Sequence, residues 1–238
     1  VLGSIEKLKP GQDSIEKSIV RQPLSPLAES YRLIRSGLLL SAAERPPKIL
    51  MVSSMEPNAG KTVTALNLSR ILSQGEKKVL LLDCDLRKPR MHLILGLNND
   101  VGISSYLSGN TNEDILCSIP GEDIEVITSG PRPPSPTELL GSQKMKDLLD
   151  KLHDRYDFIV IDSPPVQSVT DGLVLSKAVD GTLVVVKYGQ TNFDMLGGGM
   201  KKFHDVGTHL LGFVLNGQVS SESKCDFYGY SSDYAAEG

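Results

Sequence analysis

The sequence of 238 residues has no tryptophan, and aromatic residues make up only 5% of it. Cysteine is also scarce, because Cys84, Cys117 and Cys225 are the only three, and they are scattered along the chain. Three scattered cysteines provide neither a disulfide framework nor the paired spacing of a zinc site. We therefore expect a protein of a reducing compartment, held together by an apolar core.

An excess of positive charge is missing as well, since 25 lysines and arginines face 29 aspartates and glutamates, for a net charge of −4. This balance argues against a general nucleic-acid binder, so we expect no nucleic acid among the partners. No apolar run approaches the roughly 18 residues of a membrane-spanning helix, and no signal peptide opens the chain. Because the chain begins at Val1 and not at methionine, we expect it to be part of a longer protein.

Short runs of valine, isoleucine and leucine alternate with longer segments that can form helices. Such runs are typical of strands buried on both faces of a parallel sheet. The expected strands are Ile49–Val52, Val79–Leu82, Phe158–Ile161, Leu183–Val186 and Leu211–Leu215. The expected helices are residues 27–43, Lys61–Gln74, Pro136–His153, Asp171–Ala178 and Phe193–Val206. The alternation predicts an α/β fold with a doubly wound, mostly parallel sheet and helices on both faces.

The two ends of the chain differ from this pattern. Residues 1–26 are polar and contain proline, which indicates an irregular arm before a domain at residues 27–217. Residues 218–238 are rich in serine, tyrosine, aspartate and glycine, a composition typical of a flexible tail. Three of the seven tyrosines fall in its last eleven residues: Tyr228, Tyr230 and Tyr234. Inside the domain, Gly197-Gly198-Gly199 predicts a kink or break in the last helix.

A phosphate-binding loop is the clearest motif. Strand 49–52 runs into Ser53-Ser54-Met55-Glu56-Pro57-Asn58-Ala59-Gly60-Lys61-Thr62, and a helical pattern follows. In this context loop amides cradle phosphates, the lysine reaches the β- and γ-phosphates and the threonine holds Mg²⁺. The usual loop has glycine where this chain has Met55. The motif predicts a P-loop NTPase-like domain whose nucleotide contacts come from Asn58, Ala59, Gly60, Lys61, Thr62 and Val63.

Three carboxylates stand at the ends of predicted strands. Asp83 and Asp85 lie two residues apart, so their side chains point the same way, and Asp162 ends a later strand. The carboxyl ends of parallel strands meet at the edge where α/β proteins bind ligands. Oxygen ligands suit a hard cation. We therefore expect Thr62, Asp83, Asp85 and Asp162 to form the metal end of a nucleoside triphosphate·Mg²⁺ site.

With these residues in view, the chain resembles the cytoplasmic kinase domain of the bacterial tyrosine kinases of capsule and exopolysaccharide biosynthesis. The resemblance covers nearly the whole chain. Its motifs are Glu29-x2-Arg32-x2-Arg35, Asp83-x-Asp85-x-Arg87-Lys88-Pro89, the stretch from Gly130 to Leu140 and the tyrosine-bearing C-terminus. Residues 1–5 are similar to the junction just after the second membrane helix of the fused members.

The resemblance implies a tyrosine autokinase that uses ATP and Mg²⁺ and phosphorylates the tails of neighbouring copies. The implied catalytic residues are Lys61, Asp83 and Asp85. Asp83 is the candidate base for the tyrosine hydroxyl, although it could equally serve the metal. Arg87 or Lys88 would steady phosphate charge, although both could equally be plain surface charges after a strand. Asn216 would contact adenine. The implied phosphoacceptors are Tyr228, Tyr230 and Tyr234.

The resemblance also implies partners. Glu29, Arg32 and Arg35 would join copies of the chain into a ring, whereas a purely local role would be salt bridging along the helix. A transmembrane polysaccharide copolymerase or activator segment and a cognate tyrosine phosphatase are further expected partners. The domain would be cytoplasmic, attached to the inner or plasma membrane through a segment outside this chain. Its activity would regulate the polymerisation and export of capsule or exopolysaccharide.

Two other functions compete with this interpretation. Partitioning ATPases of the ParA/MinD class share the P-loop lineage, but they carry a signature lysine where this chain has Glu56, and they have no use for a terminal tyrosine cluster. A nucleotide-sensing regulator whose tail is only a docking tag is the non-enzymatic alternative. The loop also departs from the Pro-Gly-Glu-Gly-Lys of the resembled family at Asn58 and Ala59. Because asparagine tolerates the left-handed backbone, Asn58 can still shape the loop.

Overall fold

The apolar runs become the central strands of one sheet in the computed structural model, which describes residues 1–7, 19–41, 46–111 and 114–218. Within these ranges the sheet has eight strands in the order β1-β8-β7-β2-β6-β3-β5-β4. Neighbouring strands are parallel apart from β4, which is antiparallel to β5. The strands are β1 (Gly3–Glu6), β2 (Ile49–Ser54), β3 (Val79–Asp83), β4 (Leu116–Ser118), β5 (Ile124–Ile127), β6 (Phe158–Asp162), β7 (Gly181–Lys187) and β8 (Leu210–Gln218). The predicted doubly wound, mostly parallel sheet is confirmed.

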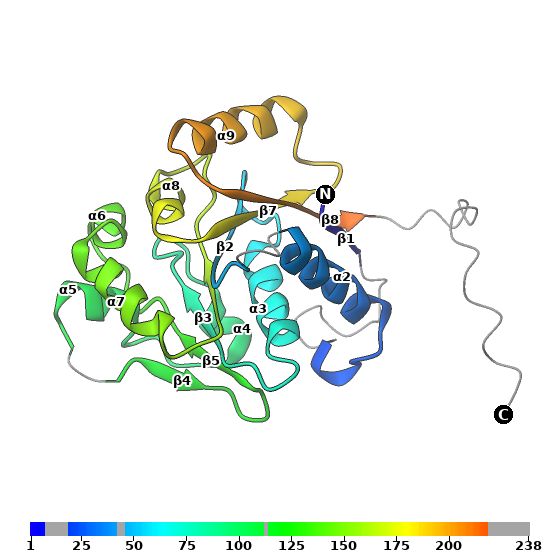
Figure 1. Cartoon of the computed structure of the whole chain (residues 1–238). Coiled ribbons are helices and arrows are strands. Elements are labelled where there is room, and N and C mark those ends of the chain that lie inside the picture. Colours follow the sequence, from blue (N-terminus) through cyan, green and yellow to red (C-terminus); the bar gives the residue numbers. More distant parts are fainter. Residues whose placement is uncertain (8–18, 42–45, 112–113, 219–238) are drawn as a thin grey trace, which may run out of the picture.

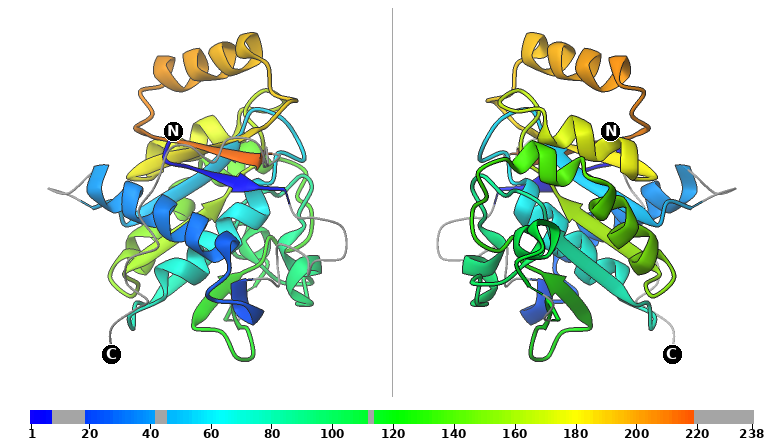
Figure 2. Two further views of the ribbon diagram at one scale, coloured as in Figure 1. Left: turned by 90° about the vertical axis from the view of Figure 1, so that its right-hand side faces the viewer. Right: turned by 90° about the vertical axis from the view of Figure 1, so that its left-hand side faces the viewer.

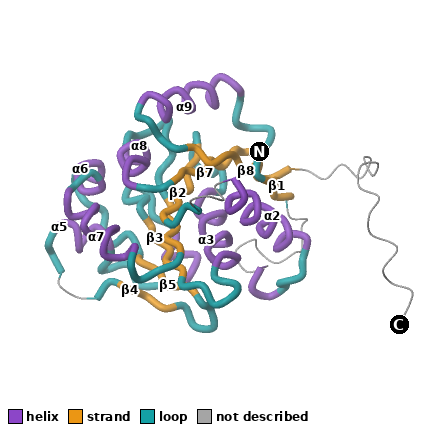
Figure 3. The backbone as a smooth tube through the Cα atoms, in the orientation of Figure 1, coloured by secondary structure: helices purple, strands orange, loops and turns teal. Residues whose placement is uncertain are grey.

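Helices cover both faces of the sheet (Figure 1 and Figure 3). They are α2 (Pro26–Ser41), α3 (Lys61–Leu72), α4 (Met91–Leu95), α5 (Ile103–Ser108), α6 (Pro136–Leu140), α7 (Gln143–His153), α8 (Asp171–Leu175) and α9 (Phe193–Asp205), with a short 3-10 turn at Ser176–Ala178. Helices α2, α3 and α4 pack on one face, and α5 to α9 pack on the other. None of the helices in the described ranges combines the length and the apolar character that a membrane crossing requires.

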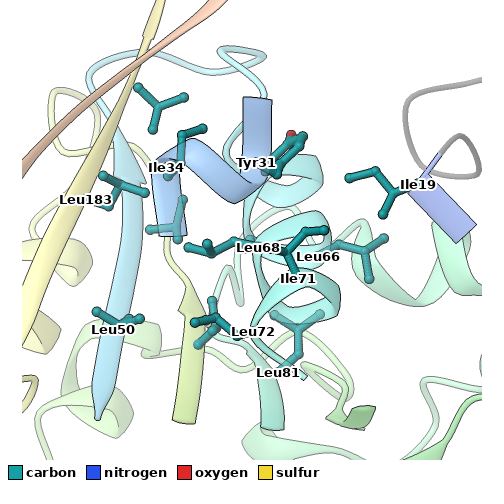
Figure 4. Close-up of a cluster of buried hydrophobic side chains, with 14 of the residues drawn as sticks. Ile19, Tyr31, Ile34, Leu50, Leu66, Leu68, Ile71, Leu72, Leu81 and Leu183 are labelled. Carbon is teal, nitrogen blue, oxygen red and sulfur yellow. The ribbon is translucent and has the colours of Figure 1, made fainter. Parts of the chain in front are cut away.

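Alternation along the strands divides the core into two apolar clusters. On β2, Leu50 and Val52 face the cluster under α2 and α3, whereas Ile49 and Met51 face the cluster under the other helices. Successive strand residues point to opposite faces, so an uninterrupted apolar strand fills both layers. Figure 4 shows part of the first cluster, where Tyr31 lies near α3.

The first residues of the chain differ from the prediction of an irregular arm. Gly3–Glu6 forms the edge strand β1, which pairs in parallel with β8 from Gly3 beside Val214 onward. Ile5 is the one buried side chain of this strand. Four residues with a single apolar anchor carry almost no periodicity, so sequence alone does not reveal a strand that the edge of β8 stabilises.

Two helix predictions are wrong in detail. The expected helix at Pro136–His153 is two helices, because Gly141 ends α6 and the Ser142 hydroxyl caps α7 by accepting the Met145 amide at 3.3 Å. The glycine triplet does not break α9, which runs unbroken through it. Gly199 is buried there because the helix passes close to Met55. The short elements β4, β5, α4 and α5 were not expected from the sequence.

Candidate active site

The strand register brings the predicted carboxylates together. Asp83 at the end of β3 pairs with Asp162 at the end of β6, and Val52 of β2 pairs with Asp162 from the other side. The loops that follow these three parallel strands therefore share one edge of the sheet. In the left view of Figure 2 the arrowheads of β1 and β8 point toward that edge. The expected meeting of strand ends is confirmed for these residues.

The loop between β2 and α3 has the left-handed turns that a phosphate cradle needs. Asn58 has φ 61° and Gly60 has φ 98°, so the asparagine takes the backbone conformation expected of it. A Cβ on Gly60 would lie 2.1 Å from Nδ2 of Asn216, which leaves room for glycine alone. Asn216 in turn donates a hydrogen bond of 2.7 Å to the carbonyl of Ala59. The loop thus delivers the N-terminus of α3, a natural anion site, to the sheet edge.

Lys61 lies at the centre of a buried charge cluster. Its ammonium donates to Oδ2 of Asp85 at 2.8 Å and lies 3.5 Å from Oδ1 of Asp162. The Thr62 hydroxyl donates to Oδ2 of Asp162 at 2.6 Å. Burial by itself lowers the pKa of Lys61, but Asp162, Asp85 and Asp83 together raise it above its ordinary value. The lysine is therefore held in its charged form, as phosphate binding requires.

Two carboxylate oxygens in this cluster lack a hydrogen-bond donor. Among the described residues, nothing donates to Oδ2 of Asp83, and Oδ1 of Asp162 has only the distant Lys61 charge. Burial, followed by the charge of Asp162, raises the pKa of Asp83 well above its usual range. Burial likewise raises the pKa of Asp162, although Lys61 and Thr62 oppose it. Buried oxygens without donors suit a cation or a proton.

The donor set fits a magnesium ion that is shared with phosphate. Within the described ranges, no three carboxylates, imidazoles or thiolates come close enough to hold a metal by themselves. Mg²⁺ is usually bound through one or two carboxylates together with substrate phosphates and water. Asp85, Asp162 and the Thr62 hydroxyl provide that number of oxygens beside the phosphate loop.

Arg87, one of two residues expected to steady phosphate charge, forms hydrogen bonds with residues of α6 and α8. Its guanidinium donates from Nε to Oδ2 of Asp171 at 2.7 Å and from Nη2 to Oδ1 at 3.0 Å. Thr137 completes the group, because its hydroxyl accepts from Arg87 and donates to Asp171. Burial alone would raise the pKa of Asp171, but these bonds hold it below the usual range. We call this group the Arg87 clamp, because it ties the segment after β3 to α6 and α8.

The expected interface residues make contacts within the chain. Arg32 pairs with Glu29 at 3.0 Å, which is the local salt bridge that their spacing allows. The Arg35 guanidinium donates to the carbonyl of Ile71, the next-to-last residue of α3, at 2.8 Å. The tail tyrosines at 228, 230 and 234 lie outside the described residues.

Some residues that shape the site had no signal in the sequence. Thr191, after β7, donates to the Glu56 carboxylate at 2.5 Å and so connects that loop to the phosphate loop. Asp171 stands at the start of a short helix and had no motif of its own. Thr137 belongs to the Gly130–Leu140 stretch, and nothing in the sequence of that stretch indicates this role.

The chain is similar in sequence to known proteins. Residues 47–199 match the family model described as an AAA domain. The chain is 35% identical over 215 residues to the tyrosine-protein kinase YwqD of Bacillus subtilis, covering 90% of this chain and 91% of that protein. It is 32% identical over 210 residues to the tyrosine-protein kinase Etk of Escherichia coli, covering 88% of this chain but only 29% of Etk.

A solved structure extends the match to three dimensions. The kinase domain of Escherichia coli Etk superposes with a TM-score of 0.86 at 28% identity, covering 97% of this chain and 94% of that domain. Sequence and fold are thus shared with tyrosine kinases over almost the entire domain, and the chain belongs to the family of bacterial tyrosine-protein kinases.

Proposed function

We propose that the domain transfers the γ-phosphoryl group of ATP to Tyr228, Tyr230 and Tyr234 in the tail of a neighbouring copy. The observation that carries the proposal is Asp83, a fully buried carboxylate beside the phosphate loop with one oxygen that lacks a donor among the described residues. Such an oxygen can accept the proton of an incoming tyrosine hydroxyl. The membership of the chain in a tyrosine-kinase family supports the same reaction.

The remaining residues position charge. Lys61 and the amides at the start of α3 bind phosphate oxygens, and Thr62, Asp85 and Asp162 hold the metal directly or through water. Mg²⁺, when bound, neutralises charge on the phosphate oxygens and aligns them for transfer. When the Lys61 ammonium turns from Asp85 toward a phosphate group, the carboxylates of Asp85 and Asp162 would be free to hold the cation. Asn216 supports the loop through its hydrogen bond to the Ala59 carbonyl and contacts the adenine base of the nucleotide.

Asp83 acts as the base because its surroundings make it more basic than an exposed aspartate. A tyrosine hydroxyl with a pKa near 10 is a weak nucleophile at neutral pH. Burial and Asp162 raise the pKa of Asp83, so its basicity lies closer to that of its target than an exposed aspartate's would. A better-matched base removes the proton more efficiently as the bond to phosphorus forms.

The proposal extends to assembly and regulation. Copies of the domain form a ring through the helix that carries Glu29, Arg32 and Arg35, and each tail enters the site of a neighbour. Each phosphate adds about −1.5 to −2 charges, so phosphorylated tails repel one another and loosen the ring. A transmembrane activator segment holds the domain at the cytoplasmic membrane, and a tyrosine phosphatase resets it. This cycle regulates the polymerisation and export of capsule or exopolysaccharide.

The test mixes two variants of this chain with ATP and Mg²⁺. One keeps an intact site but has its three tail tyrosines replaced by phenylalanine; the other keeps its tail but carries Lys61→Met. Intact-mass analysis counts the phosphates, and peptide mapping assigns them. Transfer between copies predicts phosphate on the Lys61→Met tail. If wild-type chains label themselves while this mixture stays unlabelled, transfer within one copy replaces the proposal.

A second variant tests the base. Asp83→Asn keeps the size of the side chain but removes its basicity, so the transfer rate should fall by about 10²- to 10⁴-fold. The affinity for a fluorescent ATP analogue should stay within about two-fold if Asp83 acts on the tyrosine and not on the nucleotide. An unchanged rate would exclude Asp83 as the base, and ATP hydrolysis without any phosphotyrosine in the wild type would exclude the kinase reaction.

A further inference from the structure

Three exposed cations follow β3 and β5 at the edge of the sheet that carries the site. They are Lys88, Arg90 and Arg132, and we call them the basic rim. We propose that the basic rim docks the acidic tail of a second copy, residues 219–238, and so selects tyrosines that stand beside carboxylates. This inference rests on the proposed function, since it identifies the surface that captures the substrate of that reaction.

The fold places the basic rim next to the reacting groups. Strands β3 and β5 are parallel neighbours, so the segments that carry these cations leave the same edge of the sheet. The Lys88 amide donates to Oδ1 of Asp85 at 3.1 Å, which joins this part of the rim directly to the site. Arg132 follows Gly130, whose carbonyl accepts a hydrogen bond of 3.0 Å from Asn99 in the loop after α4. A hydrogen bond therefore anchors each segment, and Lys88, Arg90 and Arg132 are exposed.

The basic rim has no counter-charge of its own in the part of the chain that the structure describes. None of its three side chains forms an ion pair there. The adjacent Arg87, in contrast, is paired with Asp171, and Lys61 is paired with Asp85. Exposed lysines elsewhere stand among acids, as on α7, where Asp147 and Asp150 are interspersed with them. Unpaired like charges beside a site attract a ligand of opposite sign.

The tail has the composition that this surface would bind. Residues 219–238 contain Glu222, Asp226, Asp233 and Glu237 against the single Lys224, a net charge of −3. Asp226 precedes Tyr228 by two residues, and Asp233 directly precedes Tyr234. With a tyrosine at Asp83, an extended chain puts these carboxylates within about 7 Å of it along the tail.

The origin of the tail and one apolar side chain fit the same surface. Strand β8 ends at Gln218, and because β8 is parallel to its neighbour β7 it ends at the sheet edge of the site. An extended chain spans at most about 35 Å from there to Tyr228, which allows exchange between adjacent copies. Leu93 on α4, three residues after Arg90, is 71% exposed and offers an apolar contact for the aromatic rings around Tyr228.

The experiment measures the kinetics of phosphoryl transfer between copies of this chain. The enzyme is the chain with its three tail tyrosines replaced by phenylalanine, with or without Lys88→Gln, Arg90→Gln and Arg132→Gln. The acceptor is the Lys61→Met chain, with its natural tail or with Glu222, Asp226, Asp233 and Glu237 replaced by their amides. A matched enzyme carries Lys146→Gln, Lys151→Gln and Lys201→Gln, which remove the same charge from exposed positions on α7 and α9.

Each exposed ion pair changes an affinity by about 1.4- to 5-fold. Neutralising the rim should therefore raise KM for the natural acceptor about ten-fold, with kcat and ATP-analogue affinity within about two-fold. Neutralising the acceptor tail should do the same, and combining the two should add nothing further. The natural pair alone should weaken strongly with added salt.

Other outcomes overturn the proposal. If KM is unchanged, if the matched enzyme loses as much, or if ATP affinity falls in proportion, the rim does not dock the tail. Fluorescence anisotropy of a labelled peptide of residues 219–238 on the full chain, without ATP, reports docking independently of catalysis. Rim-dependent binding without phosphorylation would refute the proposed function but support the docking surface, whereas rim-independent binding would refute the docking surface alone.

Discussion

The Arg87 clamp makes a prediction about stability whose size follows from burial. Arg87→Met keeps the aliphatic stem but removes both guanidinium bonds to Asp171, whose side chain is 0% exposed. Breaking a buried ion pair by removing one partner costs about 3–5 kcal/mol. Arg87 is 33% exposed and the Thr137 hydroxyl still donates, so we expect a loss below this range, about 2–3 kcal/mol.

The assay is urea unfolding of the full chain, with thermal unfolding as a second measurement. For a chain of this size, about 1 kcal/mol corresponds to about 2–4 °C, so the melting temperature of Arg87→Met should fall by about 4–12 °C. Burial would raise the pKa of Asp171, yet the Arg87 and Thr137 bonds lower it in the native state. A depressed carboxyl pKa stabilises the fold above the unfolded value of about 3.9 and stops doing so as the pH falls through the native value.

The stability difference between wild type and Arg87→Met should therefore be complete at neutral pH and shrink as the pH approaches and passes about 4. Lys88→Met is the matched control, because its side chain is exposed and has no ion-pair partner among the described residues; it should change stability by less than about 0.5 kcal/mol. A loss below about 0.5 kcal/mol for Arg87→Met, or one that is equal at every pH, would refute this account of the clamp.

Three further substitutions test the packing around the phosphate loop. In α9, Gly199→Ala would bring a Cβ to 2.0 Å from the Met55 sulfur, so its free energy of unfolding in urea should fall by about 1–3 kcal/mol. A Cβ on Gly197 meets no atom within 4 Å, so Gly197→Ala should raise the free energy of unfolding by up to about 1 kcal/mol. Equal effects of the two substitutions would contradict the close approach of Gly199 to Met55. Gly60→Ala should weaken binding of a fluorescent ATP analogue at least about ten-fold, through its left-handed backbone and its collision with Asn216, and unchanged titrations would disprove this. Asn216→Ala leaves the Ala59 carbonyl without its donor and should lower the stability by about 1–3 kcal/mol in thermal unfolding. A melting curve identical to that of the wild type would contradict this and show that water replaces the amide.

Local patterns were sufficient to predict most of the fold and part of the site. The phosphate loop is predictable because the strand, the small-residue loop and Gly60-Lys61-Thr62 follow one another directly along the chain. The aspartates at strand ends predict a common edge because parallel strands end together. The glycine triplet predicts a break because glycine has a low helix propensity, but α9 runs through it. Gly199 is needed there because its close approach to Met55 requires a residue without a side chain.

The sequence by itself thus determined the α/β alternation, the phosphate loop and the three carboxylates, since these depend on periodicity and on neighbours along the chain. Only the tertiary structure decided that Arg87 bonds with Asp171, a residue 84 positions away. It likewise decided that the four residues of β1 form a strand and that Asp83 lies opposite Asp162. Pairings of this kind depend on strand order and register, which no local pattern encodes, because they arise when distant segments bury their apolar faces in one core.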